Sequence, residues 1–193
     1  RYSCPKSPGW NMRIPDQIRA DVFLAEFREH EQQGHWPNLV IIFLPSDHTS
    51  GTRHGNPTPR AQVADNDLAV GRIVEAISQS RFWPKTCIFV IEDDPQAGFD
   101  HVDGHRSTCL VVSPYTKRGA VVSHFYNQTS VLHTMEQMLG LPPMNQMDAL
   151  APLMAQCFTS RPDFLPYMCL PNRIPLDEMN KPLSELKGQE LYW

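Results

Sequence analysis

The chain has 193 residues, of which 41% are hydrophobic and 20% are charged, and its formal net charge is −4. This length suits one domain or part of a larger one, and this composition allows a packed core. The acidic balance does not indicate a broad nucleic-acid-binding face, and no apolar run is long enough to span a membrane. The start shows no signal peptide and no methionine, so we read the chain as a mature form or as a piece of a longer protein.

The first half of the chain predicts a helix, a buried strand, a loop and a second helix. Pro15 opens a helix whose apolar residues recur at helical spacing, and Gly34 is its natural stop. Leu39–Leu44 is a continuous apolar run, as expected for a strand buried on both faces of a sheet. A loop rich in glycine, proline and asparagine follows over 50–59, and a second helix is expected over 60–79.

The second half predicts two more strands and a third helix. Strands are expected at Thr86–Ile91 and Thr108–Val112, on either side of a loop over 93–106. A third amphipathic helix is predicted for Gln128–Leu139, with Gly140 as its terminator. The order helix, strand, helix, strand, strand, helix predicts an α/β domain with a mainly parallel sheet.

Proline becomes frequent towards the C-terminus, which sets the expected domain boundary. We expect residues 1–158 to form part of the α/β domain, and 159–193 to form an irregular tail that is wrapped on the domain or poorly ordered. Three short strands make a small sheet, which favours the view that other strands of the domain are missing from this chain.

The five cysteines form no CxxC pair, so a zinc knuckle is not indicated. Cys87 and Cys109 lie in apolar, strand-like runs and are expected to be buried thiols. Cys157 and Cys169 lie in the proline-rich region and could form a disulfide if the protein is exported.

Asp93 and Asp94 directly follow the strand predicted at Thr86–Ile91 and form the strongest candidate metal site. Adjacent carboxylates repel each other and raise each other's pKa, and a bound cation relieves that repulsion. A solvated acidic turn is the alternative. The apolar strand before the pair and the histidines after it favour a metal site at the end of the strand.

Asp47 and His48 form a second polar pair, directly after the strand predicted at Leu39–Leu44. Two strands thus deliver Asp and His groups to what would be the same sheet edge. A helix-capping role for Asp47 is weak, because glycines and a proline follow it instead of a helix.

His101 and His105 lie in the loop after the acidic pair, with Asp103 between them. Neutral imidazole can bind a metal, and imidazolium can hold a phosphate oxygen. Arg106 could clamp an oxyanion or simply pair with Asp103.

These motifs resemble the phosphoesterase family, which includes bacterial phospholipases C and acid phosphatases and lies within the alkaline-phosphatase superfamily. The resemblance is carried by five segments, which are Leu44–Thr49, Ala64–Gly71, Ile91–Gly98, Asp100–Arg106 and Ser113–Tyr115. It extends over residues 10–158 and is greatest for bacterial proteins in which such a domain follows a β-propeller.

The resemblance implies a doubly wound α/β fold and metal-dependent hydrolysis of phosphoric esters through a Ser or Thr nucleophile. It assigns Asp93 and Asp94 as metal ligands, with Asp47 as a companion. His48 and His101 match positions that bind a second metal or the substrate phosphate and take part in catalysis. Oxygen-rich ligation leaves Zn, Mn, Fe, Ca and Mg open as the metal, and histidine participation favours the transition metals.

The resemblance also indicates roles and partners outside the acidic pair. His105 and Arg106 are companions expected to contact the phosphate ester. In the family, the first metal ligands and the nucleophile lie on segments that precede the one matching Arg1. This chain therefore resembles the C-terminal half of the catalytic domain, with the N-terminal half as its expected partner and a periplasmic or secreted location.

Alone, the chain is expected to bind metal weakly and not to turn over. The main alternative is a degenerate module that keeps the fold for binding or assembly. A hydrolase of sulfate or phosphonate esters ranks lower, because the cysteine motif that sulfatases need is missing. The choice between monoester, diester and phospholipid substrates, and the oligomeric state, stay open.

Overall fold

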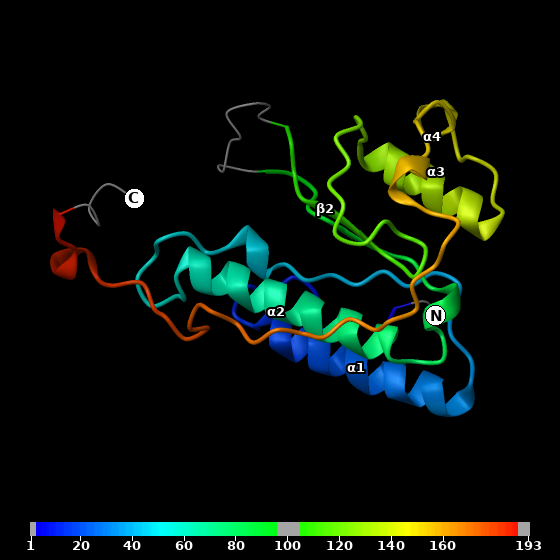
Figure 1. The fold of residues 1–193 in the computed structure, drawn as a ribbon. Helices are drawn as coiled ribbons and strands as arrows, with labels where there is room; N and C mark the ends of the chain where they lie inside the picture. Colours follow the sequence, from blue (N-terminus) through cyan, green and yellow to red (C-terminus); the bar gives the residue numbers. More distant parts are fainter. Residues whose placement is uncertain (1–2, 96–104, 189–193) are drawn as a thin grey trace. The chain divides into compact units, whose positions relative to one another are not determined.

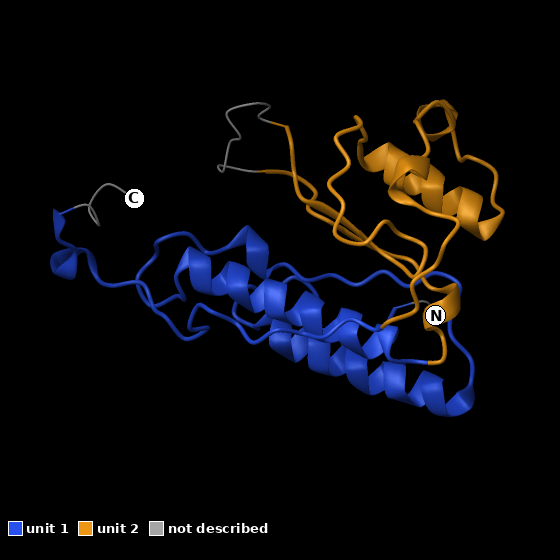
Figure 2. Ribbon diagram, in the orientation of Figure 1, with its two compact units in different colours: residues 1–80, 166–193 blue, residues 81–165 orange. Residues whose placement is uncertain are grey.

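The computed structural model describes residues 3–95 and 105–188, which fall into two compact units (Figures 1 and 2). Unit 1 comprises Arg1–Ser80 and Pro166–Trp193, and unit 2 comprises Arg81–Leu165. Unit 1 is built on two long helices, whereas unit 2 holds the strands and two further helices. No helix in the described ranges has both the length and the apolar character needed to cross a membrane.

Two helices, α1 (Asp16–Gln33) and α2 (Pro59–Ser78), lie side by side and form the frame of unit 1 (Figure 1). Pro15 is the N-cap of α1, and Gly34 ends the helix with a φ of 69°, a left-handed conformation that glycine adopts without strain. The Thr58 side chain caps α2 by accepting a hydrogen bond from a backbone N–H of the first turn. Both predicted helices are confirmed, with ends within one residue of those expected.

The core of unit 1 forms where the apolar faces of the two helices meet. Phe27 is 1% exposed, and its ring packs almost perpendicular to that of Trp36 at a centroid distance of 4.6 Å. On α2, Ala69 and Ile73 are buried. Ile18, one of the apolar residues expected to face the core from this helix, is 49% exposed, because a side chain on the edge of an apolar stripe can face water.

The segment Leu39–Leu44 corrects a prediction. Expected as a buried strand, it is irregular here, and its residues pair with no strand of the described chain. Ile41 is 86% exposed and Phe43 is 51% exposed, although the Phe43 ring stacks on Trp10 at 5.7 Å. A strand is stabilised by a ladder of hydrogen bonds and by layers on its faces, and this segment has neither within the described residues.

Unit 2 contains a hairpin of strands β1 (Ile88–Ile91) and β2 (Cys109–Val112). The strands are antiparallel, with Ile88 opposite Val112 and Ile91 opposite Cys109. Both strands were expected, but the mainly parallel, doubly wound sheet is not what the described residues show. Antiparallel strands can pair without the crossover helix that parallel strands need, and the pairing of β1 with β2 is of this kind.

Helices α3 (Gln128–Leu139) and α4 (Gln146–Ala149) pack together in unit 2 (Figure 1). The bounds of α3 match the prediction, and Gly140 ends it with a φ of 68°. Two carboxyl groups are buried where the helices meet, since Glu136 is 4% exposed and Asp148 is 1% exposed.

The two carboxyl groups have different partners. Asp148 accepts backbone N–H bonds from Met144 at 2.7 Å and Asn145 at 2.9 Å. Burial and then the neighbouring Asp148 raise the pKa of Glu136.

All five cysteines are free thiols, so the disulfide considered for Cys157 and Cys169 is not formed. Cys109 is exposed, contrary to the prediction of a buried thiol, because it lies in the first half of β2, where both residues are exposed. Cys87 is partly buried, and burial raises its pKa to about 12.

The C-terminal segment 166–188 is mostly irregular, and its first part lies along α2 (Figure 1). The Tyr167 N–H donates to the Ser78 hydroxyl at 2.9 Å. Farther along, Cys169 approaches the helix at Gly71, where an added Cβ would lie 2.9 Å from the Cys169 sulfur. Glycine at this position therefore allows the close approach of the segment to α2.

Candidate functional site

The predicted site residues fall on both units. Unit 1 carries Asp47 and His48, and unit 2 carries Asp93, Asp94, His105 and Arg106. His101 lies outside the described residues. The structure therefore describes two separate groups of candidate residues, one around the 3-10 turn η1 (Ser46–His48) and one at the end of β1. The functional roles assigned to these residues stay predictions.

The turn η1 is attached to the helices of unit 1 through its first residue. The Ser46 N–H donates to Asp16 Oδ2 at 2.9 Å, and the Ser46 hydroxyl donates to Asp65 Oδ2 at 3.0 Å. The same Asp65 oxygen accepts the Asp16 N–H at 2.6 Å, at the start of α1. Because Pro15 offers no side-chain cap, Asp65 satisfies one of the orphan N–H groups of the α1 N-terminus.

The carboxylate of Asp16 is completely buried, at 0% exposure. It pairs with the Arg19 guanidinium at 3.3 Å and accepts a bond from Asn66 Nδ2 at 3.0 Å. Burial raises the pKa of Asp16, whereas hydrogen bonds from Ser46 and Asn66 and the charge of Arg19 lower it. The net direction is upward, so burial outweighs these partners.

His48 is exposed, and its ring is held by two neighbours. The Nδ1 atom lies 3.2 Å from the Thr49 carbonyl oxygen, which accepts when Nδ1 carries the proton. The ring planes of His48 and Trp10 are perpendicular, with their centroids 5.0 Å apart. This arrangement makes Nε2 the nitrogen that can exchange a proton or contact a ligand.

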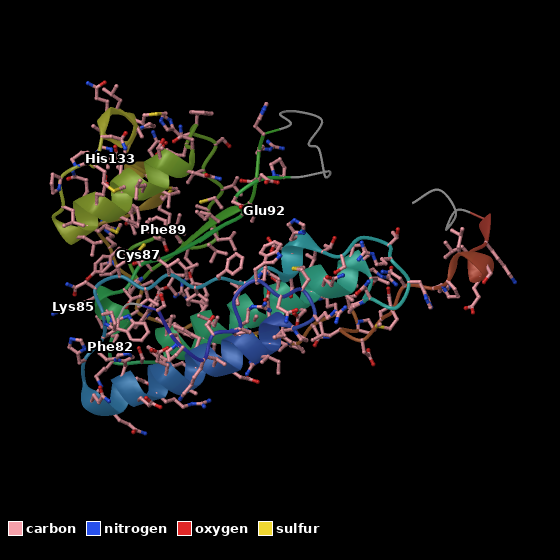
Figure 3. The ribbon with its side chains drawn as sticks, turned by 180° about the vertical axis from the view of Figure 1, so that it is seen from behind. Phe82, Lys85, Cys87, Phe89, Glu92 and His133 are labelled. Carbon is pink, nitrogen blue, oxygen red and sulfur yellow. The ribbon has the colours of Figure 1, made fainter. Side chains whose placement is uncertain are left out.

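The candidate residues of unit 2 lie where the β1–β2 hairpin ends (Figure 3). Glu92 extends the ladder, because its N–H donates to the Thr108 carbonyl at 3.1 Å and its own carbonyl accepts from the Ser107 hydroxyl at 2.9 Å. Glu92 thus closes the hairpin and sets the direction in which the chain leaves β1.

Asp93 and Asp94 come next and are both exposed. The Asp94 N–H donates to Asp93 Oδ1 at 3.1 Å, and the Asp93 carbonyl accepts from the Gln128 side chain at the start of α3. His105 and Arg106 are exposed ahead of β2. The carboxylates keep further lone pairs, so the pair suits a hard or borderline cation.

Carboxylate and imidazole groups suit a divalent metal, but within residues 3–95 and 105–188 the candidate ligands lie together only two at a time. In those ranges no group of three or more His, Cys, Asp or Glu residues is arranged to hold a metal ion. Two carboxylates supply fewer ligands than the four to six or more that protein-bound cations take.

Sequence reasoning missed the buried polar residues Asp16 and Asp65. A signal was available for Asp65, which lies four residues from both Ala61 and Ala69 on the buried face of α2. A carboxylate on the core face of an amphipathic helix needs a buried partner. The pattern does not say which residue that partner is, because Asp16 lies 49 residues away in the sequence.

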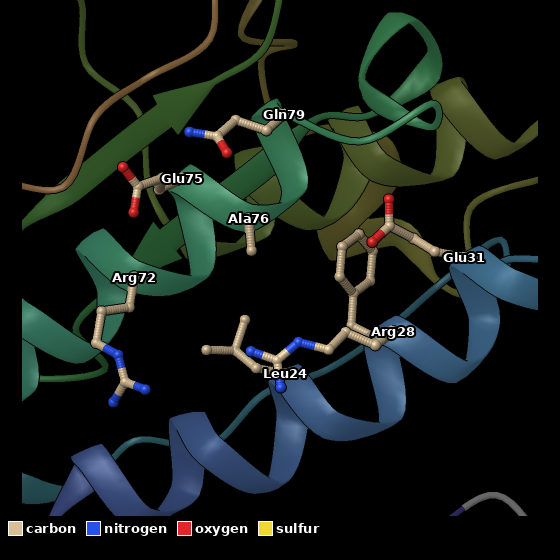
Figure 4. Close-up of a pocket in the computed structure, with 8 residues that line it drawn as sticks. Leu24, Arg28, Glu31, Arg72, Glu75, Ala76 and Gln79 are labelled. Atoms are coloured by element: carbon tan, nitrogen blue, oxygen red, sulfur yellow. The ribbon is translucent and has the colours of Figure 1, made fainter.

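A cavity of about 460 Å³ lies between α1 and α2 (Figure 4). Its rim carries both charge signs, with Arg28 and Glu31 from α1 and Arg72 and Glu75 from α2. It contains none of the predicted site residues.

The comparisons with known proteins concern the segment that contains both groups of candidate residues. A search of curated proteins gave no match. The sequence profile of the Phosphoesterase family matches residues 4–142, which include η1, α2, the β1–β2 hairpin and α3. This match covers well over half of the chain and confirms the resemblance seen in the motifs. The chain therefore belongs to the phosphoesterase family.

Proposed function

We propose that this chain takes part in the metal-dependent hydrolysis of phosphoric esters. The family match over residues 4–142 carries the proposal, because phosphoester hydrolysis is the activity expected of that family. The matched segment includes the acidic pair Asp93-Asp94 and the pair Asp47-His48. Carboxylates and imidazoles beside exposed strand or turn ends suit a divalent cation and a phosphate ester.

The proposed roles follow from chemistry. Asp93 and Asp94 would hold a metal, which when bound neutralises charge on the phosphoryl oxygens and lowers the pKa of a coordinated oxygen. Asp47 is a further proposed metal ligand, on unit 1. His105 and Arg106 would hold the non-bridging oxygens of the substrate. The exposure of all four residues of unit 2 supports these roles, since groups that bind a ligand from solvent must be accessible.

His48 and His101 are the proposed acid–base groups. For His48, the contact of Nδ1 with the Thr49 carbonyl supports a tautomer in which Nδ1 carries the proton and Nε2 is the acceptor. A neutral Nε2 can accept a proton from an attacking oxygen, and the same atom can return it to the leaving group.

We further propose that an N-terminal half of the domain supplies the nucleophile and the first metal ligands, completes a doubly wound sheet and covers the apolar segment Leu39–Leu44. The exposure of Ile41 at 86% and Phe43 at 51% supports this, because such an apolar run is stable in water only when covered. A periplasmic or secreted location belongs to the same proposal.

The test assays the protein together with its N-terminal half, using a phosphomonoester and a phosphodiester with and without chelator. Asp93→Asn should lower metal-dependent turnover at least about 100-fold, since even indirect disturbance of a metal site costs 10- to 100-fold. Asp177→Asn is the matched control, because Asp177 is exposed and lies outside the matched segment.

Three results would decide against the proposal or its parts. Unchanged turnover in the Asp93→Asn protein would refute the metal assignment. Robust metal-dependent hydrolysis by the isolated chain would refute the need for an N-terminal half. Absence of hydrolysis from the complete protein with every metal tried would favour the binding or assembly module.

A further inference from the structure

We propose that Asp16, Asp65 and Asn66 are positioning residues that hold the turn carrying Asp47 and His48 in its working orientation. This rests on the function proposed for His48. It assigns a role to three residues that contact the start of the turn and are not candidate site residues themselves.

The attachment is a closed set of hydrogen bonds around Ser46, the first residue of the turn. Its N–H donates to Asp16 Oδ2 and its hydroxyl donates to Asp65 Oδ2, at 2.9 and 3.0 Å. Asp16 and Asp65 are themselves joined, because the Asp16 N–H donates to the same Asp65 oxygen at 2.6 Å. Ser46 therefore cannot shift without breaking bonds to both α1 and α2.

Asn66 fixes the residue on the other side of Pro45. Its Nδ2 donates to the Leu44 carbonyl at 2.9 Å and to Asp16 Oδ2 at 3.0 Å. The chain is thus held at Leu44 and again at Ser46, immediately before Asp47 and His48. Two anchors on either side of a proline with a fixed φ define the path into the turn.

Burying these charged groups costs free energy, which indicates that the arrangement serves something other than stability. Asp16, Arg19, Ser46 and Asp65 are each at most 6% exposed, so the carboxylates have given up water. Buried ion pairs add little net stability, and apolar residues of similar volume often serve as well or better. Their better-attested benefit is to select one geometry, which here is that of the turn.

The chain just after the turn is strained. Thr49 has φ 60° and ψ 164°, and it is the one residue other than glycine with positive φ in the part of the chain described. A β-branched residue in this region is costly and persists only where its surroundings enforce it. Such strain clusters at functional sites, and the anchors at Leu44 and Ser46 supply the enforcement.

The consequence is a defined direction for the His48 ring. The ring is perpendicular to the Trp10 ring with the centroids 5.0 Å apart, and its Nδ1 is 3.2 Å from the Thr49 carbonyl. A turn released from Ser46 would relax at Thr49 and lose both contacts.

The test reads the His48 ring directly by NMR in the full 193-residue chain. The Trp10 ring current shifts the His48 ring protons, and Asp65→Ala should abolish that shift while circular dichroism shows α1 and α2 still formed. Asp65→Asn keeps an acceptor oxygen for Ser46 and should restore the shift. Asp67→Ala, an exposed aspartate on the same helix, should leave it unchanged.

A milder variant covers the case in which Asp65→Ala does not fold. Ser46→Ala keeps the N–H bond to Asp16 and removes only the hydroxyl bond to Asp65, so it should reduce the shift in a folded chain. A wild-type His48 shift in folded Asp65→Ala or Ser46→Ala would overturn the positioning role. A loss of thermal stability alone would show that Asp65 is merely structural.

A kinetic measurement separates this proposal from the function on which it rests. With the N-terminal half present, Asp65→Ala should lower kcat about 10- to 100-fold with little change in KM, and Asp65→Asn should recover most of it. An active wild type with unchanged kcat in Asp65→Ala would overturn the positioning role alone. No hydrolysis by the wild type, with the His48 shift still dependent on Asp65, would overturn the proposed function and leave the turn geometry explained.

Discussion

Replacing Asp16 by alanine should destabilise unit 1 by about 4 kcal/mol. Three donors reach this buried side chain: the Ser46 N–H, the Asn66 amide and the Arg19 guanidinium. Each buried donor left unsatisfied costs about 1–3 kcal/mol, and a buried ion pair that loses one partner costs about 3–5 kcal/mol. The total loss should lie near the lower ends of these ranges, because Arg19 keeps its bond to the Gly9 carbonyl and Asn66 keeps its bond to the Leu44 carbonyl.

The assay is urea unfolding, followed by circular dichroism for α1 and α2 and by tryptophan fluorescence. Asp21→Ala is the matched control on the same helix, because Asp21 is half-exposed and pairs with Arg72 at the surface. The loss of such a surface pair should cost less than about 1 kcal/mol. An Asp16→Ala protein no less stable than the Asp21→Ala protein would refute the view that Asp16 joins α1 to the turn.

Two further predictions concern unit 2. Because the pKa of Cys87 is raised from 9.0 to about 12, its thiolate fraction at pH 8 should be about 1,000-fold lower than in the unfolded chain. Iodoacetamide labelling read by mass spectrometry should slow by that factor, and similar rates in native and unfolded protein would contradict this. Because Glu136 has a folded pKa above its ordinary 4.5, its stabilising contribution is complete below pH 4.5 and is lost as the pH rises through the folded value. Glu136→Gln should flatten this fall in the free energy of unfolding, and an unchanged pH profile would count against it.

The helices were predictable because their signals are local. Gly34 and Gly140 end α1 and α3 in left-handed conformations, as their positions after apolar stripes indicate. The strand at Leu39–Leu44 was predicted from hydrophobicity alone, and it failed because a strand also needs a neighbour to pair with. The antiparallel β1–β2 register likewise depends on which strands meet, and no local pattern states this.

The candidate site, like the fold, has features that local sequence predicts and features that depend on long-range contacts. The residue types and their order along the chain indicated the family, which the family match confirms. They also predicted Asp47, His48, Asp93 and Asp94 as site residues, since ligand chemistry is a property of side chains.

The way in which the turn at Ser46 is held becomes visible only in the packed structure. Its bonds to Asp16 and Asp65 join residues 30 and 19 positions apart. Such pairs form when helices pack and exclude water, so burial selects the partner of each carboxylate and the sequence around it does not.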